Sequence, residues 1–228
     1  MCSAETRLRT ALVVGATGLV GSELVKQLAA HPGYGRVIVL ARRCPVALPP
    51  SCEFMALADH AQDVPEDLST QIDHYFCALG TTTKQAGRKG LEAVDHHLVI
   101  NTARLALQQG ASLLSVVSAL GASTTSPFHY SRVKGRMEAE LESLEAAVTH
   151  IWQPSVLQGP RAAARSLEVL SGILLKCLPF TDLRPVTGAQ LAKAIIAAAT
   201  ARAGQVHSGV SRYKVRDILQ LNLQNRVQ

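Results

Sequence analysis

Three glycines spaced three residues apart constrain the fold of this chain more than any other feature. They are Gly15, Gly18 and Gly21, within the segment TALVVGATGLVGSEL at residues 10–24. The apolar run at 11–14 predicts a buried strand before them, and apolar residues with helical spacing follow them. The glycines therefore lie at a strand-to-helix turn, where this pattern is typical of a phosphate-binding loop. A plain turn between a strand and a helix is the alternative interpretation.

Each glycine has its own physical reason in a dinucleotide-binding turn. Gly15 permits the sharp turn, and Gly18 removes a side chain where a pyrophosphate would approach the backbone. Gly21 allows the helix to pack closely against the sheet. The N-terminus of that helix then presents free N–H groups and a partial positive charge to the phosphates.

Apolar runs alternate with helical segments along most of the chain. Runs typical of strands lie at 11–14, 36–40, 53–57, 74–77, 112–117 and 149–152, and helical spacing at 18–30, 91–109, 129–147 and 187–203. This alternation predicts an α/β fold, a Rossmann-type doubly wound parallel sheet with helices on both faces. The length of 228 residues suits a single domain over 1–228, in which 155–228 would form a smaller region on the substrate side.

The composition limits where the protein works and what it binds. Hydrophobic residues make up 47% of the chain and charged residues 18%, which is typical of a globular protein. No apolar window reaches the roughly 18 residues of a membrane span, and the first ten residues lack an apolar signal core. We therefore expect a cytoplasmic protein with no membrane partner.

Charge and cysteine usage exclude two further classes of site. The net charge of +6 is spread over small groups, and aromatic residues make up only 4%, so we expect no nucleic-acid partner. The five cysteines show no metal-binding spacing and are expected to be free thiols. His96 and His97 are adjacent, so on a helix they should point away from each other. We therefore expect no metal.

The segment after the second expected strand carries arginine where a dinucleotide-binding fold usually carries an acid. NAD enzymes place Asp or Glu there, about 20 residues after the glycines, on the ribose hydroxyls. No acidic residue occurs between Glu23 and Glu53, and the strand instead runs into Arg42 and Arg43. A guanidinium pairs with the 2′-phosphate of NADP, which a carboxylate would repel. The sequence therefore predicts NADP(H), unless these arginines are solvated loop charges.

A tyrosine and a lysine four residues apart form the candidate catalytic pair. Ser126 and Pro127 predict a helix start, which places Tyr130 and Lys134 on one helix face. The ammonium of Lys134 favours the phenolate of Tyr130, so this phenol can exchange a proton near neutral pH. Ser118 follows the fifth strand at the carboxyl edge, where its hydroxyl can hold a substrate carbonyl. Other hydroxyl residues compete for that role: Ser115, Ser123, Thr124 and Thr125.

A glycine stands next to the candidate lysine. Gly135 weakens a helix interior by roughly 1 kcal/mol. Close approach of another backbone segment would explain why a glycine lies at this position. The sequence therefore predicts a tight contact at the middle of this helix.

The glycine turn together with YxxxK at 130–134 resembles the short-chain dehydrogenase/reductase superfamily. Three longer segments are more specific: FCALGTTTKQAG at 76–87, VDHHLVINTARLALQQG at 94–110 and SALGASTTSPFHYSRVKGRMEAEL at 118–141. They resemble an atypical subgroup, the Tat-interacting-protein-like, epimerase-like NADPH-binding oxidoreductases. Some members of this family bind NADPH and act through protein partners.

The resemblance implies a role for each position that matches the family pattern. It assigns Ser118, Tyr130 and Lys134 to catalysis, with Lys134 also bonding the nicotinamide ribose. It assigns the cofactor to residues of four loops and one lysine: Gly15, Thr17, Gly18, Leu19, Val20, Arg42, Arg43, Leu79, Gly80, Thr81, Lys134, Pro154 and Ser155. Gln153 stands where the family usually has arginine.

These features predict an NADP(H)-dependent oxidoreductase that transfers a hydride to or from a carbonyl or alcohol. Its substrate would be a small molecule, bound partly by residues 155–185. Two alternatives remain: an NADPH-binding regulatory protein that acts through a protein partner, and a sugar-nucleotide epimerase-like enzyme. The chain is short for the epimerase, and the sequence leaves a homodimer open.

Overall fold

A seven-stranded parallel sheet lies at the centre of the protein. The structure is a computed structural model, and it describes residues 7–57, 68–159, 184–201 and 208–224. In spatial order the strands are β3 (Cys52–Ala56), β2 (Tyr34–Ala41), β1 (Arg9–Val14), β4 (His74–Cys77), β5 (Leu113–Val117), β6 (Val148–Trp152) and β9 (Gly209–Tyr213). Every neighbouring pair is parallel, which confirms the predicted Rossmann-type sheet.

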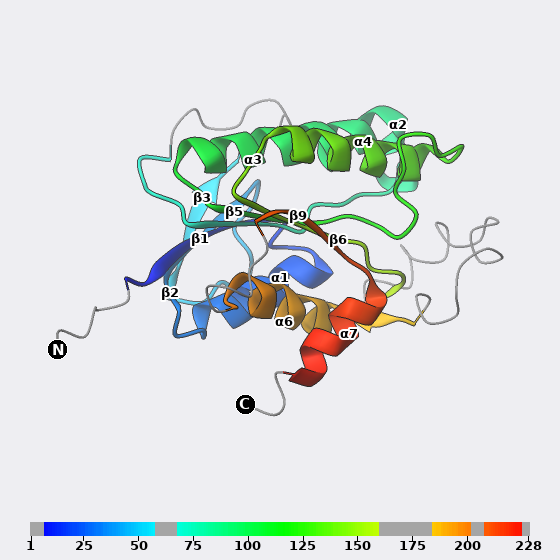
Figure 1. Ribbon diagram of the computed structural model, residues 1–228. Helices are drawn as coiled ribbons and strands as arrows, with labels where there is room; N and C mark the ends of the chain where they lie inside the picture. Colours follow the sequence, from blue (N-terminus) through cyan, green and yellow to red (C-terminus); the bar gives the residue numbers. More distant parts are fainter. Residues whose placement is uncertain (1–6, 58–67, 160–183, 202–207, 225–228) are drawn as a thin grey trace.

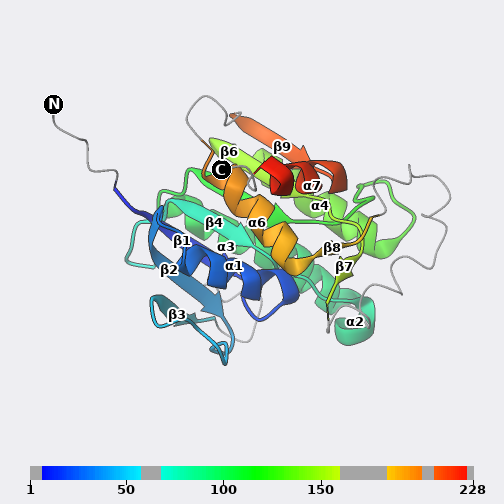
Figure 2. The same cartoon turned by 90° about the horizontal axis from the view of Figure 1, so that it is seen from below.

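Helices cover both faces of this sheet (Figure 1). One face carries α2 (Thr83–Glu92), the π-helical segment η1 (Ala93–Leu98), α3 (Val99–Gln108) and α4 (His129–Ser143). The other face carries α1 (Leu19–Ala29) and α6 (Gly188–Ala199), and α7 (Val215–Gln224) packs beside α6 (Figure 2). A second, two-stranded sheet joins β7 (Leu157–Gln158) to β8 (Val186–Thr187).

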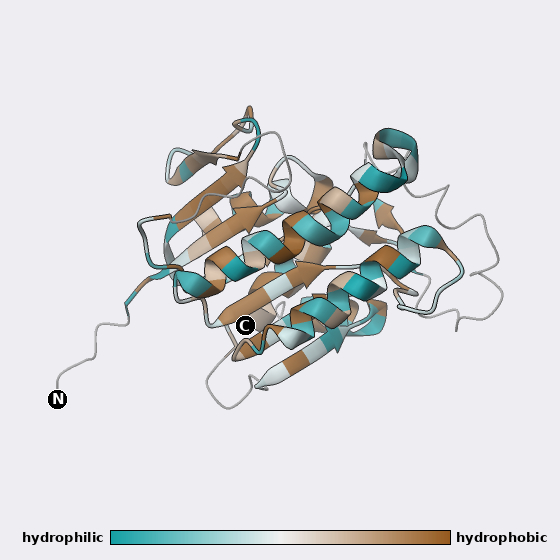
Figure 3. Cartoon of the chain, turned by 90° about the horizontal axis from the view of Figure 1, so that it is seen from above, coloured by the Kyte–Doolittle hydropathy of each residue, from teal (hydrophilic) through white to brown (hydrophobic). Residues whose placement is uncertain are grey.

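Each face of the sheet has its own apolar core, because successive strand side chains point to opposite faces. Val13 and Phe76 belong to the core beneath α1 and α6, whereas Leu12 and Tyr75 belong to the core beneath α3 and α4. The strands are largely hydrophobic, and α3 and α4 turn hydrophilic residues outward (Figure 3). The alternation of apolar strands and amphipathic helices thus produces the layered fold that the sequence predicts.

The start of α4 differs from the sequence prediction. The helix begins at His129 rather than after Ser126, because Phe128 is extended, with φ −82° and ψ 125°. Ser126 closes the preceding turn instead, where its hydroxyl accepts the N–H of Phe128 at 3.2 Å. Tyr130 consequently lies in the first turn of α4.

The sequence also missed the last strand, β9. Its residues alternate between half-buried and exposed, so no continuous apolar run indicates a strand. This pattern is typical of the edge of a sheet, where one side of the strand has no neighbour. The edge position matters for the site, because β9 carries Arg212.

Two buried histidines lie on the strands beneath α1 and α6. His74 shares a 2.7 Å hydrogen bond with the hydroxyl of Tyr34. The ring of His150 packs edge-on against Trp152, and its Nδ1 has no hydrogen-bond partner among the described residues. Burial lowers the pKa of His74 to about 4 and that of His150 to about 4. Both rings are therefore neutral in the folded protein at neutral pH.

We expect these histidines to make the fold acid-sensitive. Unfolding restores an ordinary histidine pKa of 6.5, so the unfolded chain binds protons first as the pH falls. The contribution of each neutral histidine to the free energy of unfolding is fully present above pH 6.5. It is lost progressively between pH 6.5 and about 4, by on the order of 3 kcal/mol per histidine. Denaturant unfolding at a series of pH values measures this loss.

His150→Phe keeps an aromatic ring and removes one titrating group, so its unfolding free energy should depend less steeply on pH. His97→Gln changes an exposed histidine and serves as the control. An unchanged slope in His150→Phe would contradict the assignment.

Candidate cofactor and catalytic site

The glycine turn lies between β1 and α1 and has the geometry expected of it. Gly15 has a φ of +84°, and a Cβ there would lie 2.6 Å from the carbonyl carbon of Ala78. A Cβ on Gly21 would lie 2.1 Å from the carbonyl oxygen of Gly15. Both positions therefore require glycine, the first for the turn and the second for close packing of α1.

The N-terminus of α1 fits a dinucleotide diphosphate. Gly18 is the N-cap, no side chain caps the helix, and the first turn contains no acidic residue. The turn lies next to the end of β4, where the strand order reverses and doubly wound sheets bind their ligands. A side chain on Gly18 would stand 3.2 Å from the Gly15 carbonyl oxygen, so its absence leaves this cradle open.

The neighbouring loop residues contribute mainly their backbone. Val20 is buried in the apolar core, and the side chain of Leu19 lies against Gly159, where a Cβ would come within 2.4 Å of it. Thr17 is exposed at the turn. Backbone N–H groups of Leu19 and Val20, rather than their side chains, are thus the groups that face an anion at this helix end.

Two arginines lie at the same edge of the sheet. Arg42 and Arg43 directly follow β2, and both side chains are exposed. Because all strands are parallel, the ends of β1 and β2 meet at one edge, which brings these arginines to the side of the glycine turn. Their position is the one that the sequence predicts for the adenosine ribose.

The candidate lysine is buried and paired with an acid that the sequence analysis missed. Lys134 is 2% exposed, and its Nζ lies 2.8 Å from Oδ1 of Asp95, which is fully buried. The other carboxylate oxygen of Asp95 accepts the backbone N–H of Thr81 at 2.8 Å. Lys134 also donates to the carbonyl of Leu79 at 3.5 Å. The loop after β4, with Leu79, Gly80 and Thr81, is therefore attached to α4 and η1.

Asp95 lies in η1, where the helix widens into a π-helical turn. Such turns occur often at functional sites, because the extra residue changes the direction of the side chains. The sequence predicted one helix over 91–109, and an acid within a helix gives no signal of burial by itself. The residues next to Asp95 in the sequence also give no sign of its partner, because Lys134 is 39 positions away.

The electrostatics at Tyr130 also differ from the expectation. Burial raises the pKa of Tyr130, the Lys134 ammonium lowers it and the Asp95 carboxylate raises it, with a net increase. Burial lowers the pKa of Lys134, but Asp95 and Tyr130 together raise it more, so the lysine stays charged. Lys134 acts in the expected direction, but burial and Asp95 outweigh it, and the phenol keeps its proton.

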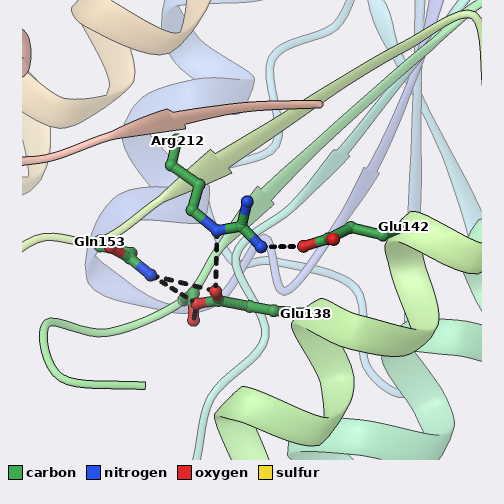
Figure 4. A network of polar contacts seen from close by, with 5 residues as sticks. Glu138, Glu142, Gln153 and Arg212 are labelled. Atoms are coloured by element: carbon green, nitrogen blue, oxygen red, sulfur yellow. Dashed lines mark hydrogen bonds and ion pairs between the residues drawn. The ribbon is translucent and has the colours of Figure 1, made fainter. Parts of the chain in front are cut away.

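Ser118 lies directly after β5, as predicted, but its hydroxyl is already engaged. It donates to Glu138 of α4, a carboxylate that is almost fully buried. The amide of Gln153 donates to both Glu138 oxygens at 3.0 Å, and Nε of Arg212 lies 3.5 Å from Oε2 (Figure 4). The guanidinium of Arg212 also donates to Glu142. The only proton of Ser118 therefore points to Glu138.

Other candidate residues have different surroundings. Ser115 is buried and accepts the indole N–H of Trp152 at 2.9 Å, which removes it as a competitor of Ser118. Pro154 is buried, and its carbonyl accepts the N–H of Leu120 at 3.0 Å. Ser155 donates to the carbonyl of Arg184 at 2.7 Å. Of the expected pocket segment 155–185, residues 160–183 lie outside the described residues.

Two further sequence predictions concern Gly135 of α4 and the neighbouring histidines His96 and His97. A Cβ on Gly135 would lie 2.2 Å from the backbone carbon of Ser123, which confirms the predicted close approach. The expectation that His96 and His97 point apart is wrong, since their ring centroids lie 4.8 Å apart in the wide π-helical turn. No group of three metal-ligating side chains occurs within the described ranges.

Comparison with known proteins decides the family. The model of the semialdehyde dehydrogenase NAD-binding domain matches residues 10–127, just over half of the chain. Protein FMP52, mitochondrial, of Eremothecium gossypii is 38% identical over 66% of this chain and 67% of its own. The chain belongs to the atypical short-chain dehydrogenase/reductases.

Further similarities agree with this family. Protein HTATIP2 of Rattus norvegicus is 29% identical over 75% of this chain and 72% of its own. A short-chain dehydrogenase family protein from Francisella tularensis has a TM-score of 0.69 and 14% identity, covering 94% of this chain and 100% of that one. This last likeness shows the fold, and the family match shows an NAD(P)-binding domain of the oxidoreductase type.

The relatives correct one expectation, that of a cytoplasmic location. FMP52 proteins of Eremothecium gossypii and of other fungi are named mitochondrial, which contradicts it. The expectation rested on missing targeting features, and such an absence is weak evidence for a compartment. In the described segments, no helix has the length and apolar character that crossing a membrane needs.

Gln153 raises the question of which residue compensates the charge of Glu138 in this protein. Where other atypical short-chain dehydrogenase/reductases usually carry arginine, Gln153 still donates to Glu138, and Arg212 of the edge strand supplies the positive charge. The side chain of Arg212 is 43% exposed, whereas that of Glu138 is 6% exposed. The charge on the buried carboxylate is therefore compensated from a different strand.

We expect Glu138→Ala to destabilise the protein by about 2 to 4 kcal/mol, because the buried donors of Ser118 and Gln153 lose their acceptor. Glu142→Ala is the matched control on the same helix. Its side chain is 37% exposed, so its loss should cost less than about 1 kcal/mol. Denaturant unfolding compares the two variants, and equal losses would contradict the role given to Glu138.

Proposed function

We propose that this protein is an NADP(H)-dependent oxidoreductase that interconverts a carbonyl compound and its alcohol. The observation that carries this proposal is the position of Tyr130, one helical turn from the buried ammonium of Lys134. Lys134 in turn contacts the loop after β4, at the edge of the sheet where the glycine turn ends. The proposed proton donor and the proposed nucleotide cradle would thus lie at the same edge of the sheet.

The cofactor would be held by the backbone at Gly15, Gly18 and the start of α1, with Arg42 and Arg43 at the adenosine end. Two exposed guanidinium groups and the absence of an acid at the end of β2 support a 2′-phosphate, and hence NADP(H) over NAD(H). When bound, the nicotinamide supplies or accepts the hydride.

The side chains of this protein would then handle the proton and the orientation of the substrate. Tyr130 would pass a proton to or from the substrate oxygen, and Lys134 would hold the ribose and the phenol in place. Ser118 presents its oxygen as an acceptor, because its hydroxyl proton points to Glu138. In this arrangement Ser118 would bind a hydroxyl group, such as that of the alcohol.

We expect NADPH to bind more tightly than NADH, by tenfold or more. Arg42→Ala and Arg43→Ala should each weaken NADPH by about tenfold, the value of one charge-assisted pair, and leave NADH nearly unchanged. Fluorescence titration of both cofactors measures this. Arg136→Ala, which removes an exposed arginine of α4, should change neither affinity. Equal affinity of the parent protein for both cofactors would overturn the NADP assignment.

Tyr130→Phe should lower turnover at least about 100-fold, the usual contribution of a positioned proton donor, and change NADPH affinity less than twofold. NADPH oxidation with a panel of small aldehydes and ketones measures turnover. Tyr213→Phe removes a hydroxyl on β9 and should have no such effect. Unchanged turnover in Tyr130→Phe would refute the catalytic role. NADPH binding without turnover of any carbonyl would support the regulatory alternative.

A further inference from the structure

Two glycines from the second half of the chain converge on Leu19, the first residue of α1. A Cβ on Gly159, directly after β7, would lie 2.4 Å from Cδ1 of Leu19. A Cβ on Gly188, the first residue of α6, would lie 2.6 Å from the carbonyl oxygen of Leu19. Leu19 is therefore in close contact with both segments, and we refer to this arrangement as the Leu19 contact.

The backbone conformation does not explain why these two residues are glycines. Neither Gly159 nor Gly188 has a positive φ, so other residues could adopt the same backbone angles. Gly188 lies in a helix, where alanine is the better helix former. The close approach of Leu19 is thus the physical reason for a glycine at each position.

The segments that form the Leu19 contact are tied to each other and to α1. β7 pairs with β8, and the N–H of Val186 donates to the carbonyl of Val156 at 3.0 Å. The side-chain amide of Gln27 in α1 donates to the carbonyl of Ala189 in α6 at 3.2 Å. α1 and α6 lie side by side, with β7 and β8 at the end of both (Figure 2). The start of α6 therefore has a fixed position relative to the start of α1.

The position of Leu19 matters because it begins the helix that fits a dinucleotide diphosphate. Gly18 is the N-cap, and no side chain satisfies the free N–H groups of the first turn. Such N–H groups bind phosphate oxygens over a narrow range of distances, about 2.7 to 3.2 Å. A displacement of Leu19 by an ångström would consequently weaken these hydrogen bonds.

We propose that Gly159 and Gly188 are positioning residues for the dinucleotide, which act by fixing the place of Leu19 at the start of α1. The inference rests on dinucleotide binding in the proposed function. It depends neither on hydride transfer nor on the choice of NADP(H) over NAD(H).

The same contact relates the two ends of the candidate cofactor site. Pro154 and Ser155, the candidate nicotinamide residues, directly precede β7, and the Ser155 hydroxyl donates to the carbonyl of Arg184 before β8 at 2.7 Å. Through Gly159 and Gly188, these segments meet the start of α1. The Leu19 contact therefore sets the diphosphate end of the site relative to the nicotinamide end.

The two glycines differ in which atoms an added side chain would displace. The three nearest atoms at Gly159 are Cδ1, Cδ2 and Cγ of Leu19, which can move by a change of rotamer. The nearest atoms at Gly188 are the carbonyl oxygen and carbon of Leu19, which belong to the helix backbone. Gly188→Ala must therefore move the start of α1, whereas Gly159→Ala need move only a side chain.

Titration of NADPH and of NADH by fluorescence tests this difference. Gly188→Ala should raise both dissociation constants at least about tenfold, the value of one charge-assisted hydrogen bond, and Gly159→Ala should raise them less than about threefold. Ala189→Ser enlarges the next, exposed residue of α6 and should leave both unchanged. Circular dichroism and thermal unfolding establish that each variant is folded. A folded Gly188→Ala with the parent affinities would overturn the proposal, because a merely structural role lowers only the melting temperature.

A size exchange keeps the proposal testable if Gly188→Ala fails to fold. Gly159→Val is too large for a rotamer change alone and should weaken both dinucleotides, and Leu19→Ala removes the three atoms nearest to Gly159. The double variant should therefore bind within about threefold of the parent, which is a strongly non-additive result. Additive losses in the double variant would show that Gly159 does not act through Leu19, and would overturn the proposal.

The parent protein separates this inference from the proposed function. If it binds dinucleotides but turns over no carbonyl, hydride transfer fails, and the affinities of the variants still decide the role of the Leu19 contact. If it binds NADPH and NADH equally, only the preference for NADP(H) fails. If it binds neither, dinucleotide binding and the positioning role are both overturned.

Discussion

The buried ion pair between Lys134 and Asp95 joins the parts of this protein that carry the candidate site. It connects α4 to η1, and through Thr81 it connects both to the loop after β4. That loop lies against the glycine turn, since Gly15 approaches the backbone of Ala78 too closely for any side chain. A single pair of charges thus relates the position of α4, which carries Tyr130, to that of the glycine turn.

The second buried carboxylate, that of Glu138, binds a different set of side chains. Glu138 accepts from Ser118, Gln153 and Arg212, so it sets the direction of the Ser118 hydroxyl and links α4 to the ends of β5 and β6 and to β9. Each carboxylate lies next to a positively charged side chain and accepts at least one hydrogen bond, as buried charges require. Ser118 is consequently oriented as an acceptor toward any further partner.

Sequence periodicity predicted the layers of the fold because each strand and helix carries its own apolar pattern. It found six of the seven strands of the main sheet and the glycine turn, and the predicted reasons for Gly15, Gly21 and Gly135 were confirmed. It missed β9, whose half-exposed residues carry no such pattern, and placed the start of α4 too early. Edge strands and helix starts depend on neighbours that the local sequence does not contain.

By itself, the sequence determined the Rossmann-type sheet, the glycine cradle and the spacing of Tyr130 and Lys134 on one helix face. These follow from local backbone preferences and from the periodicity of apolar residues. Only the tertiary structure decided the charge state of the site. Asp95 lies 39 positions before Lys134, and Arg212 lies 74 positions after Glu138. The strength of such pairs depends on burial and distance, which arise only when the chain is folded.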